Sequence, residues 1–150
     1  MRVIAGSEKG KKLKAPPKTR GVRPLTDQAK EALFNILGEK VVDSILLDLF
    51  AGTGAVGIEA LSRGAKIAIF VELHRPVVAL IRENLTLTGF LDRSEIYAVD
   101  VMRALNLLGS KGAKFDIIFM GAPYDSPVLE KALIKLSELD VLNPEGWIIA

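Results

Sequence analysis

The chain has 150 residues, of which 49% are apolar and 25% are charged, and it contains no cysteine. This length and composition fit one folded domain with a sizeable core, and they exclude a disulfide framework, a cysteine nucleophile and a thiolate metal cluster. His74 is the single histidine, so a histidine-rich zinc site is excluded as well and we expect no metal.

The beginning of the chain has no long apolar run after a basic segment, and no stretch reaches the roughly 18 apolar residues that a membrane span needs. We therefore expect a soluble cytoplasmic protein, monomeric and without a membrane partner.

The basic residues are concentrated at the N-terminus, although the net charge is only +2. Residues 1–23 carry eight basic side chains and one acidic side chain, whereas residues 24–150 carry twelve and seventeen. A basic arm (residues 1–24) before an acidic body (residues 25–150) favours a polyanionic partner such as RNA, and a solvated tail is the alternative. The candidate RNA-binding residues are Arg2, Lys9, Lys11, Lys12, Arg20 and Arg23.

The first predicted elements are a hairpin and a helix. Residues 2–4 and 12–14 can pair across a turn between Gly6 and Gly10. Thr26 or Asp27 can cap the helix that follows, and Gly38 can end it. Its predicted apolar stripe consists of Ala29, Ala32, Leu33, Ile36 and Leu37.

From Ser44 onward, short apolar runs alternate with helical patterns. Strands are predicted over 45–50, 67–71, 95–98 and 115–120 and from Trp147 to the end. Helices are predicted from the glycine loop to about Gly64, over 76–87 and over 102–108. A further helix is predicted after Ser126, which we expect to cap it, with Pro127 at its first position. The pattern predicts an α/β fold, a doubly wound and mostly parallel sheet whose ligands bind beyond the carboxyl ends of the strands.

The first of these strands leads into a glycine-rich loop, a candidate cofactor site formed by Phe50, Ala51, Gly52, Thr53 and Gly54. Glycines allow a ligand close to the backbone, and the next helix presents free N–H groups to it. Gly57 completes the spacing of a dinucleotide-binding loop, so the glycines alone do not separate a nicotinamide cofactor from S-adenosylmethionine. A carboxylate at Asp48 favours the latter, because it attracts an ammonium group and repels a pyrophosphate.

Acidic residues end three successive strands. Asp48 ends the first, Glu72 (followed by Leu73) ends the second and can accept from ribose hydroxyls, and Asp100 (followed by Val101) ends the third and can accept from an adenine amine. Helix caps and loop ion pairs are the alternative explanation for each acid.

Four segments together resemble the RsmD family, whose members methylate the N2 amine of a guanine in small-subunit ribosomal RNA. The segments are residues 2–6, 23–27, 31–35 and 48–54. The resemblance covers essentially the whole chain. It implies a class I methyltransferase fold, S-adenosylmethionine as donor, and ribosomal RNA in a partly assembled small subunit as partner. The cofactor contacts that it implies are Asp48, Gly52, Gly54, Glu72 and Asp100.

The sequence departs from the family at the end of the fourth strand. The family's motif there is Asp or Asn, Pro, Pro, Tyr, whereas this chain has Gly121, Ala122, Pro123 and Tyr124 as its catalytic candidates. Tyr124 keeps the stacking role and the Gly121 carbonyl remains an acceptor, but the side-chain acceptor is missing. We therefore expect intact cofactor binding and weak methyl transfer. We also expect the family's C-terminal hairpin to be absent, because the sequence ends in strand five.

Three other functions remain open from the sequence. They are a nicotinamide-dependent oxidoreductase, a non-catalytic protein that binds RNA or cofactor, and an enzyme that methylates an adenine amine in DNA or RNA.

Overall fold

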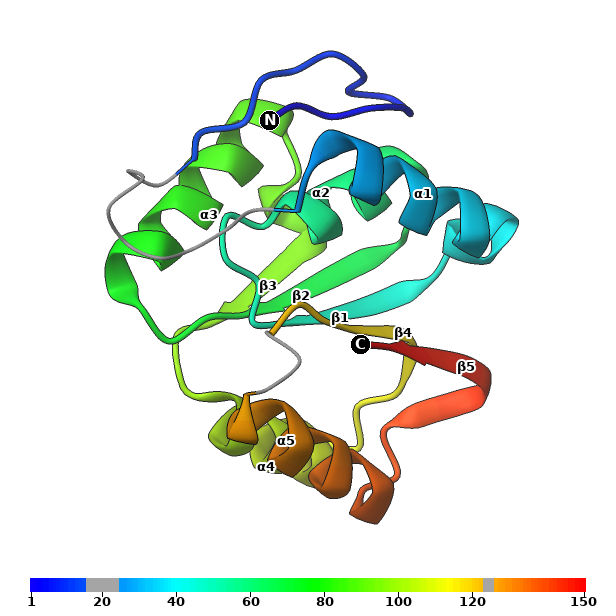
Figure 1. Ribbon diagram of the computed structural model, residues 1–150, viewed down its shortest axis with the longest axis vertical. Helices are drawn as coiled ribbons and strands as arrows, with labels where there is room; N and C mark the ends of the chain where they lie inside the picture. The colour runs from blue at the N-terminus through cyan, green and yellow to red at the C-terminus, as the bar shows by residue number, and fades with distance from the viewer. Residues whose placement is uncertain (16–24, 123–125) are drawn as a thin grey trace.

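The computed structural model describes residues 1–15, 25–122 and 126–150. Five parallel strands form one sheet in the order β3-β2-β1-β4-β5, with helices on both faces (Figure 1). The strands are β1 (Ile45–Leu49), β2 (Ile67–Val71), β3 (Ser94–Tyr97), β4 (Phe115–Met120) and β5 (Leu142–Ile149). The helices are α1 (Asp27–Leu37), η2 (Gly38–Val41), α2 (Ala55–Ser62), α3 (Arg75–Thr88), η3 (Leu91–Arg93), α4 (Val101–Ser110) and α5 (Pro127–Glu138). The predicted α/β fold is confirmed.

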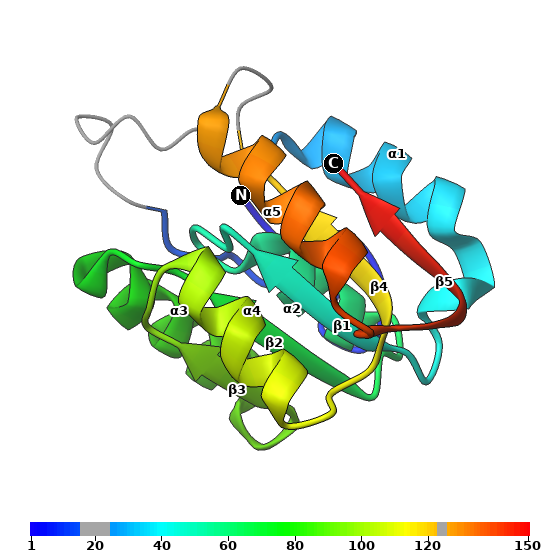
Figure 2. The ribbon, with the colours of Figure 1, turned by 90° about the horizontal axis from the view of Figure 1, so that it is seen from below.

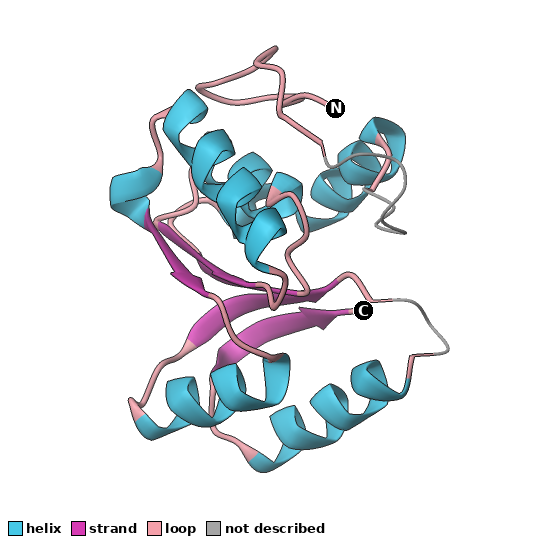
Figure 3. Ribbon diagram, turned by 90° about the vertical axis from the view of Figure 1, so that its left-hand side faces the viewer, coloured by secondary structure: helices cyan, strands magenta, loops and turns pink. Residues whose placement is uncertain are grey.

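Two apolar cores lie on opposite faces of the sheet because successive side chains of a strand point to opposite faces. Leu46 and Phe70 pack toward α1, α2 and α3, whereas Leu47 and Ile118 pack toward α4 and α5. Figure 3 shows the two helix layers on either side of the strands, and in Figure 2 α4 and α5 cross the near face. Strands buried on both sides explain the continuous apolar runs in the sequence.

Strand order reverses between β1 and β4. The chain moves from β1 outward through β2 to β3 and then returns to pair β4 with the other side of β1. In doubly wound sheets this reversal opens a crevice beyond the carboxyl ends of the two central strands. The glycine loop after β1 and Gly121 after β4 both lie there.

An N-terminal hairpin forms, but its pairing is shorter than predicted, because Ile4 N and Lys14 N donate to Glu59 and Asn84 instead of pairing across the hairpin. Arg2 pairs with Lys12 in an antiparallel bridge, and Val3 and Leu13 are buried in the core shared with α1, α2 and α3. Within residues 1–15 the hairpin is therefore packed on the body, and its lysines remain exposed on the outer side.

The predicted apolar stripe of α1 is mostly wrong. Ala29, Ala32 and Ile36 are exposed, and the buried face of the helix contains Lys30, Phe34 and Leu37. Lys30 is buried because its ammonium contacts Glu59 at 3.2 Å and donates to the Arg2 carbonyl at 2.7 Å. The ion pair rotates the helix away from the orientation that apolar residues alone predict.

Two smaller predictions also need correction. β5 begins at Leu142, five residues before Trp147, because an irregular stretch that includes Glu145 at a φ of 67° joins two paired parts of the strand. Ser126 occupies the cap position of α5, but its side chain makes no capping hydrogen bond. Among the described residues, none of the helices combines the length and apolar character that a membrane crossing requires.

Candidate cofactor and RNA site

Asp48 is the most deeply buried polar group at the strand ends, with 1% of its surface exposed. It lies on the α2 side of β1, and its carboxylate accepts a hydrogen bond from Gly57 N at 3.3 Å. Burial raises the pKa of Asp48 well above its usual value, the Gly57 hydrogen bond opposes that increase, and the nearby Glu72 carboxylate adds to it. A buried carboxylate with this electrostatic cost is suited to receive a cation.

The glycine loop turns sharply out of β1. Phe50 has a φ of 59°, and Gly54 has a φ of 82° at the cap position of α2. A non-glycine residue in the left-handed region costs free energy, and such strain occurs often at ligand-binding loops. At Gly57 the requirement is packing, because a Cβ there would overlap the buried Phe70 ring. The left-handed residues thus allow the sharp turn, and the missing side chain at Gly57 allows α2 to approach β2 closely.

Glu72 joins the glycine loop to the end of β2. One carboxylate oxygen accepts from Gly52 N at 3.0 Å and the other accepts from His74 N at 3.0 Å. These bonds fix the carboxylate beside the loop. The oxygen bound to His74 N also lies 3.2 Å from the His74 ring Nδ1, whereas the oxygen bound to Gly52 N retains acceptor capacity for a ligand hydroxyl. Leu73 is 56% exposed next to it, which leaves an apolar face beside the acid.

Asp100 follows β3 and caps α4, accepting from Arg103 N at 3.0 Å. The capping explanation therefore holds for this acid, and its exposed carboxylate can still accept from a ligand. Glu72 N donates to Tyr97 O at 3.1 Å, so the ends of β2 and β3 are in contact. Val101, at the first position of α4, is buried.

Gly121 lies at the tip of β4, directly beside the tip of β1. Met120 pairs with Leu49, and a Cβ built on Gly121 would lie 3.9 Å from the Phe50 carbonyl and 3.2 Å from the Phe119 ring. Ala122 is half-buried and packs on the core beneath α4 and α5. Pro123 and Tyr124 are outside the described residues.

The predicted RNA-binding residues of the hairpin are exposed. Arg2 lies 4.0 Å from Asp27 and Lys11 lies 3.4 Å from Glu8, separations that give weak pairing at the surface. Lys9 and Lys12 are exposed as well. Arg20 and Arg23 are outside the described residues.

The sequence analysis did not predict the buried polar side chains that lie under the hairpin. Asn84 binds both Lys14 and Thr53, and Glu59 accepts from Ile4 N and Ala5 N. An asparagine on the buried face of a helix was the available signal, since buried amides require partners.

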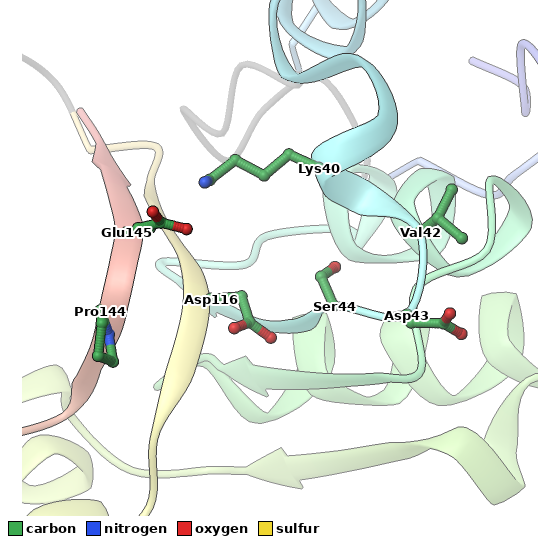
Figure 4. Close-up of a pocket in the computed structure, with 7 residues that line it drawn as sticks. All are labelled: Lys40, Val42, Asp43, Ser44, Asp116, Pro144 and Glu145. Carbon is green, nitrogen blue, oxygen red and sulfur yellow. The ribbon is translucent and has the colours of Figure 1, made fainter.

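A pocket of about 230 Å³ lies at the opposite, amino edge of the sheet (Figure 4). It is mostly acidic, with Lys40 reaching into it above the strands, and its lining residues are Lys40, Val42, Asp43, Ser44, Asp116, Pro144 and Glu145. The Asp116 carboxylate is already used by Ile45 N at 2.8 Å and by the Asn143 amide at 3.0 Å. This pocket is separate from the glycine loop. Within the described residues, no cluster of three or more His, Cys, Asp or Glu side chains could hold a metal ion.

Comparison with solved structures agrees with this geometry. A protein from Thermus thermophilus that is described as hypothetical superposes with a TM-score of 0.85 and 30% identity over 99% of this chain and 84% of its own. The fold and the strand-end site define a class I S-adenosylmethionine-dependent methyltransferase. The model of a family described as "Conserved hypothetical protein 95" matches residues 1–150, and the chain belongs to that family, the RsmD family.

Curated relatives agree with this assignment. A Bacillus subtilis protein, YlbH, which its name assigns provisionally to the rRNA methyltransferases, is 39% identical over all of this chain and 81% of its own length. Ribosomal RNA small subunit methyltransferase D of Escherichia coli K12 is 36% identical over 99% of this chain and 69% of its own length. The resemblance noted in the sequence is confirmed.

Proposed function

We propose that this protein transfers a methyl group from S-adenosylmethionine to the exocyclic N2 amine of a guanine in small-subunit ribosomal RNA. The observation that carries the proposal is the contact network at the ends of β1, β2 and β3, where Glu72 binds the glycine loop through Gly52 and the end of β3 through Tyr97, beside the buried Asp48. The names of the relatives support the RNA substrate.

The described residues fit this cofactor. In the proposal Asp48 attracts the ammonium of the methionine moiety, Glu72 accepts from the ribose hydroxyls, and Asp100 accepts from the adenine amine. Leu73 offers its exposed apolar surface to the adenine ring. Gly52 is the part-exposed glycine of the loop, and Phe50, Ala51, Thr53, Gly54 and Val101 complete the proposed cofactor-binding set.

When bound, the cofactor would supply an electrophilic methyl on its sulfonium, and transfer of that methyl to the amine would leave S-adenosylhomocysteine and release one amine proton to solvent. Protein groups then act by orienting the base. In the proposal the Gly121 carbonyl accepts one N–H bond of the amine, and Tyr124 stacks on the base. No side chain at position 121 accepts the second N–H bond, so we propose that methyl transfer is slow.

The hairpin supports the RNA half of the proposal. Arg2 and Lys9 line the hairpin side of a groove of about 400 Å³, and Asp27 and Glu31 line its α1 side. Lys11 and Lys12 are exposed on the same hairpin. These cations, rather than the groove as a whole, suit the phosphates of a single-stranded segment, whose target base can leave its stack. We propose that the protein acts as a monomer in the cytoplasm on RNA in a partly assembled small subunit.

Three measurements test the proposal. Titration with S-adenosylhomocysteine and with NADH should show binding of the former alone. Incubation with labelled S-adenosylmethionine and small-subunit RNA should label the RNA slowly, and mapping should find the label on a guanine N2. Label on an adenine amine would show that the substrate is adenine and not guanine. Cofactor binding without any labelled RNA would favour a non-catalytic binding protein.

A further inference from the structure

Asn84 lies in the middle of α3 with none of its surface exposed. Its amide oxygen accepts from Lys14 N at 2.8 Å, and its amide nitrogen donates to Lys14 O at 3.0 Å and to Thr53 O at 3.1 Å. Lys14 ends the second strand of the hairpin, and Thr53 is in the glycine loop. One buried side chain therefore links the basic hairpin directly to the cofactor loop.

A second contact joins the same two segments. The Thr53 hydroxyl lies 3.6 Å from the Met1 sulfur, and Met1 O accepts from Leu13 N at 3.0 Å. Both strands of the hairpin thus reach Thr53, one through Met1 and the other through Asn84. The Asn84 amide thus ties the position of the loop to that of the hairpin, because leaving a buried amide without one of its partners costs free energy.

The other attachments of the hairpin do not touch the loop. Ser62, near the end of α2, accepts from Glu8 N at 3.0 Å and donates to Ala5 O at 2.7 Å. Glu59 accepts from the backbone of Ile4 and Ala5. These bonds hold the turn side of the hairpin, so Ser62 provides a matched comparison for Asn84.

The Lys14 side chain is available to RNA while its backbone is held. Its ammonium is 3.2 Å from the Glu83 carboxylate, and both side chains are more than half exposed, at 60% and 52%. A surface pair of this kind contributes little stability, so a phosphate can replace Glu83 as the partner of Lys14. RNA bound along the hairpin would then restrain the residue that Asn84 holds.

We propose that Asn84 couples RNA binding on the hairpin to the cofactor loop, so that RNA and S-adenosylmethionine bind with positive cooperativity. The inference rests on the proposed function. In the proposal, RNA that reduces the motion of the hairpin also reduces the motion of the Asn84 amide and of Thr53. The cofactor then loses less conformational entropy of the loop when it binds, and its affinity is higher. Asn84 is a positioning residue, since it acts through Thr53 and Lys14.

The direct test measures the dissociation constant of S-adenosylhomocysteine by calorimetry, with and without saturating RNA from small ribosomal subunits. We expect RNA to tighten binding about fivefold or more, the lower end of typical coupling between sites. RNA that binds and leaves this affinity unchanged would overturn the coupling alone. RNA or S-adenosylhomocysteine that fails to bind at all would overturn the proposed function and the coupling with it.

Two variants test whether the coupling passes through Asn84. Asn84→Ala should reduce the RNA-induced tightening to about onefold, whereas Ser62→Ala, which removes two hairpin bonds elsewhere, should retain it. Thermal melting checks that both variants fold. If Asn84→Ala does not fold, Asn84→Asp replaces it, because aspartate keeps the shape and the acceptor for Lys14 N but loses both donors. Tightening retained in the folded Asn84 variant would refute the role of this residue.

Hydrogen exchange gives a readout that a merely structural role would not change. RNA added without cofactor should slow exchange at the amides of Gly52 to Gly54 in the unmodified protein and in Ser62→Ala, and it should leave that exchange unchanged in the Asn84 variant. Equal slowing in all three proteins would contradict the proposal.

Discussion

At the scale of single residues, the buried Asp48 carboxylate lowers the stability of the free protein. A carboxylate with 1% exposure is expensive to keep ionised, and the raised pKa reflects that cost. Position 48 alternates with apolar residues on a strand, where packing alone would select a hydrophobic side chain. The proposed ammonium ligand would account for its presence there.

Asp48→Asn should raise the melting temperature of the free protein at neutral pH. Because the folded pKa is above the unfolded value of about 3.8, the stability that the protonated group contributes is complete below that value. It is lost as pH rises through the folded pKa. The gain of the variant should therefore increase as pH rises above about 3.8, until the folded group is ionised, and a gain independent of pH would contradict this assignment.

The same variant should bind S-adenosylhomocysteine about tenfold or more weakly, as expected when a charged hydrogen-bond partner is lost. Calorimetry over the same pH range measures this. Unchanged affinity would remove Asp48 from the cofactor site.

Gly121 is the residue at which this chain departs from its family. Gly121→Asp with Ala122→Pro should raise methyl transfer by on the order of 10²-fold, because it restores a side-chain acceptor for the amine. A Cβ at position 121 lies 3.2 Å from the Phe119 ring, so that ring must move by a few tenths of an ångström. Single-turnover assays with labelled donor measure the rate, and affinity for S-adenosylhomocysteine should stay constant. Equal rates in the two proteins would contradict the assigned role.

At the scale of elements, the position of α1 depends on a buried ion pair. Lys30 and Glu59 are fully buried, and Glu59 also accepts from Arg63 Nε at 2.7 Å and from the hairpin backbone. Periodicity cannot predict this arrangement, because a lysine on a helix normally indicates the solvent-facing side. The predicted stripe through Ile36 was wrong for that reason, as Ile36 is 70% exposed.

Lys30→Met should destabilise the protein by about 3 kcal/mol, because removing one member of a buried pair leaves the other uncompensated. The effect should be at the low end of the usual range, since Glu59 keeps its other donors. Urea unfolding measures it, with Lys66→Met as the control because Lys66 is exposed and the charge change is identical. A loss no larger than the control's would mean that the pair does not stabilise the docked helix.

The strands were the easiest elements to predict. β2 has the predicted bounds because it is an uninterrupted apolar run between Lys66 and Glu72, and β4 has them because its apolar run, broken only by Asp116, lies between Lys114 and Gly121. β5 was more difficult, because Pro144 and Gly146 interrupt the pattern that identifies a strand. Local sequence therefore predicted the buried centre of the sheet better than its edge.

At the scale of the whole molecule, the candidate site combines residues far apart in sequence. The glycine loop and the acids Asp48, Glu72 and Asp100 were identifiable because parallel strands end at one edge of the sheet. Asn84 could be marked as a buried amide that needs partners, but the contacts of Asn84 and Met1 with Thr53 could not be predicted, because they arise from the docking of the hairpin on α3. Periodicity contains no information about that packing.

The charge distribution predicts a salt-dependent affinity for RNA. Each phosphate contact contributes about 0.7 to the slope of log affinity against log salt for single-stranded RNA. Lys9→Glu with Lys12→Glu should therefore reduce that slope by about 1.4 and leave S-adenosylhomocysteine binding unchanged. Fluorescence anisotropy over a salt series measures the slope. A slope that is unchanged would exclude these lysines from the RNA interface.

The central claim is that the ends of β1, β2 and β3 hold the methyl donor. A crystal structure with S-adenosylhomocysteine tests it most directly. The account predicts the ligand's ammonium beside Asp48, its ribose on Glu72 and its adenine between Leu73 and Asp100. Ligand density at another place, for example in the pocket between Lys40 and Glu145 at the amino edge, would contradict the account.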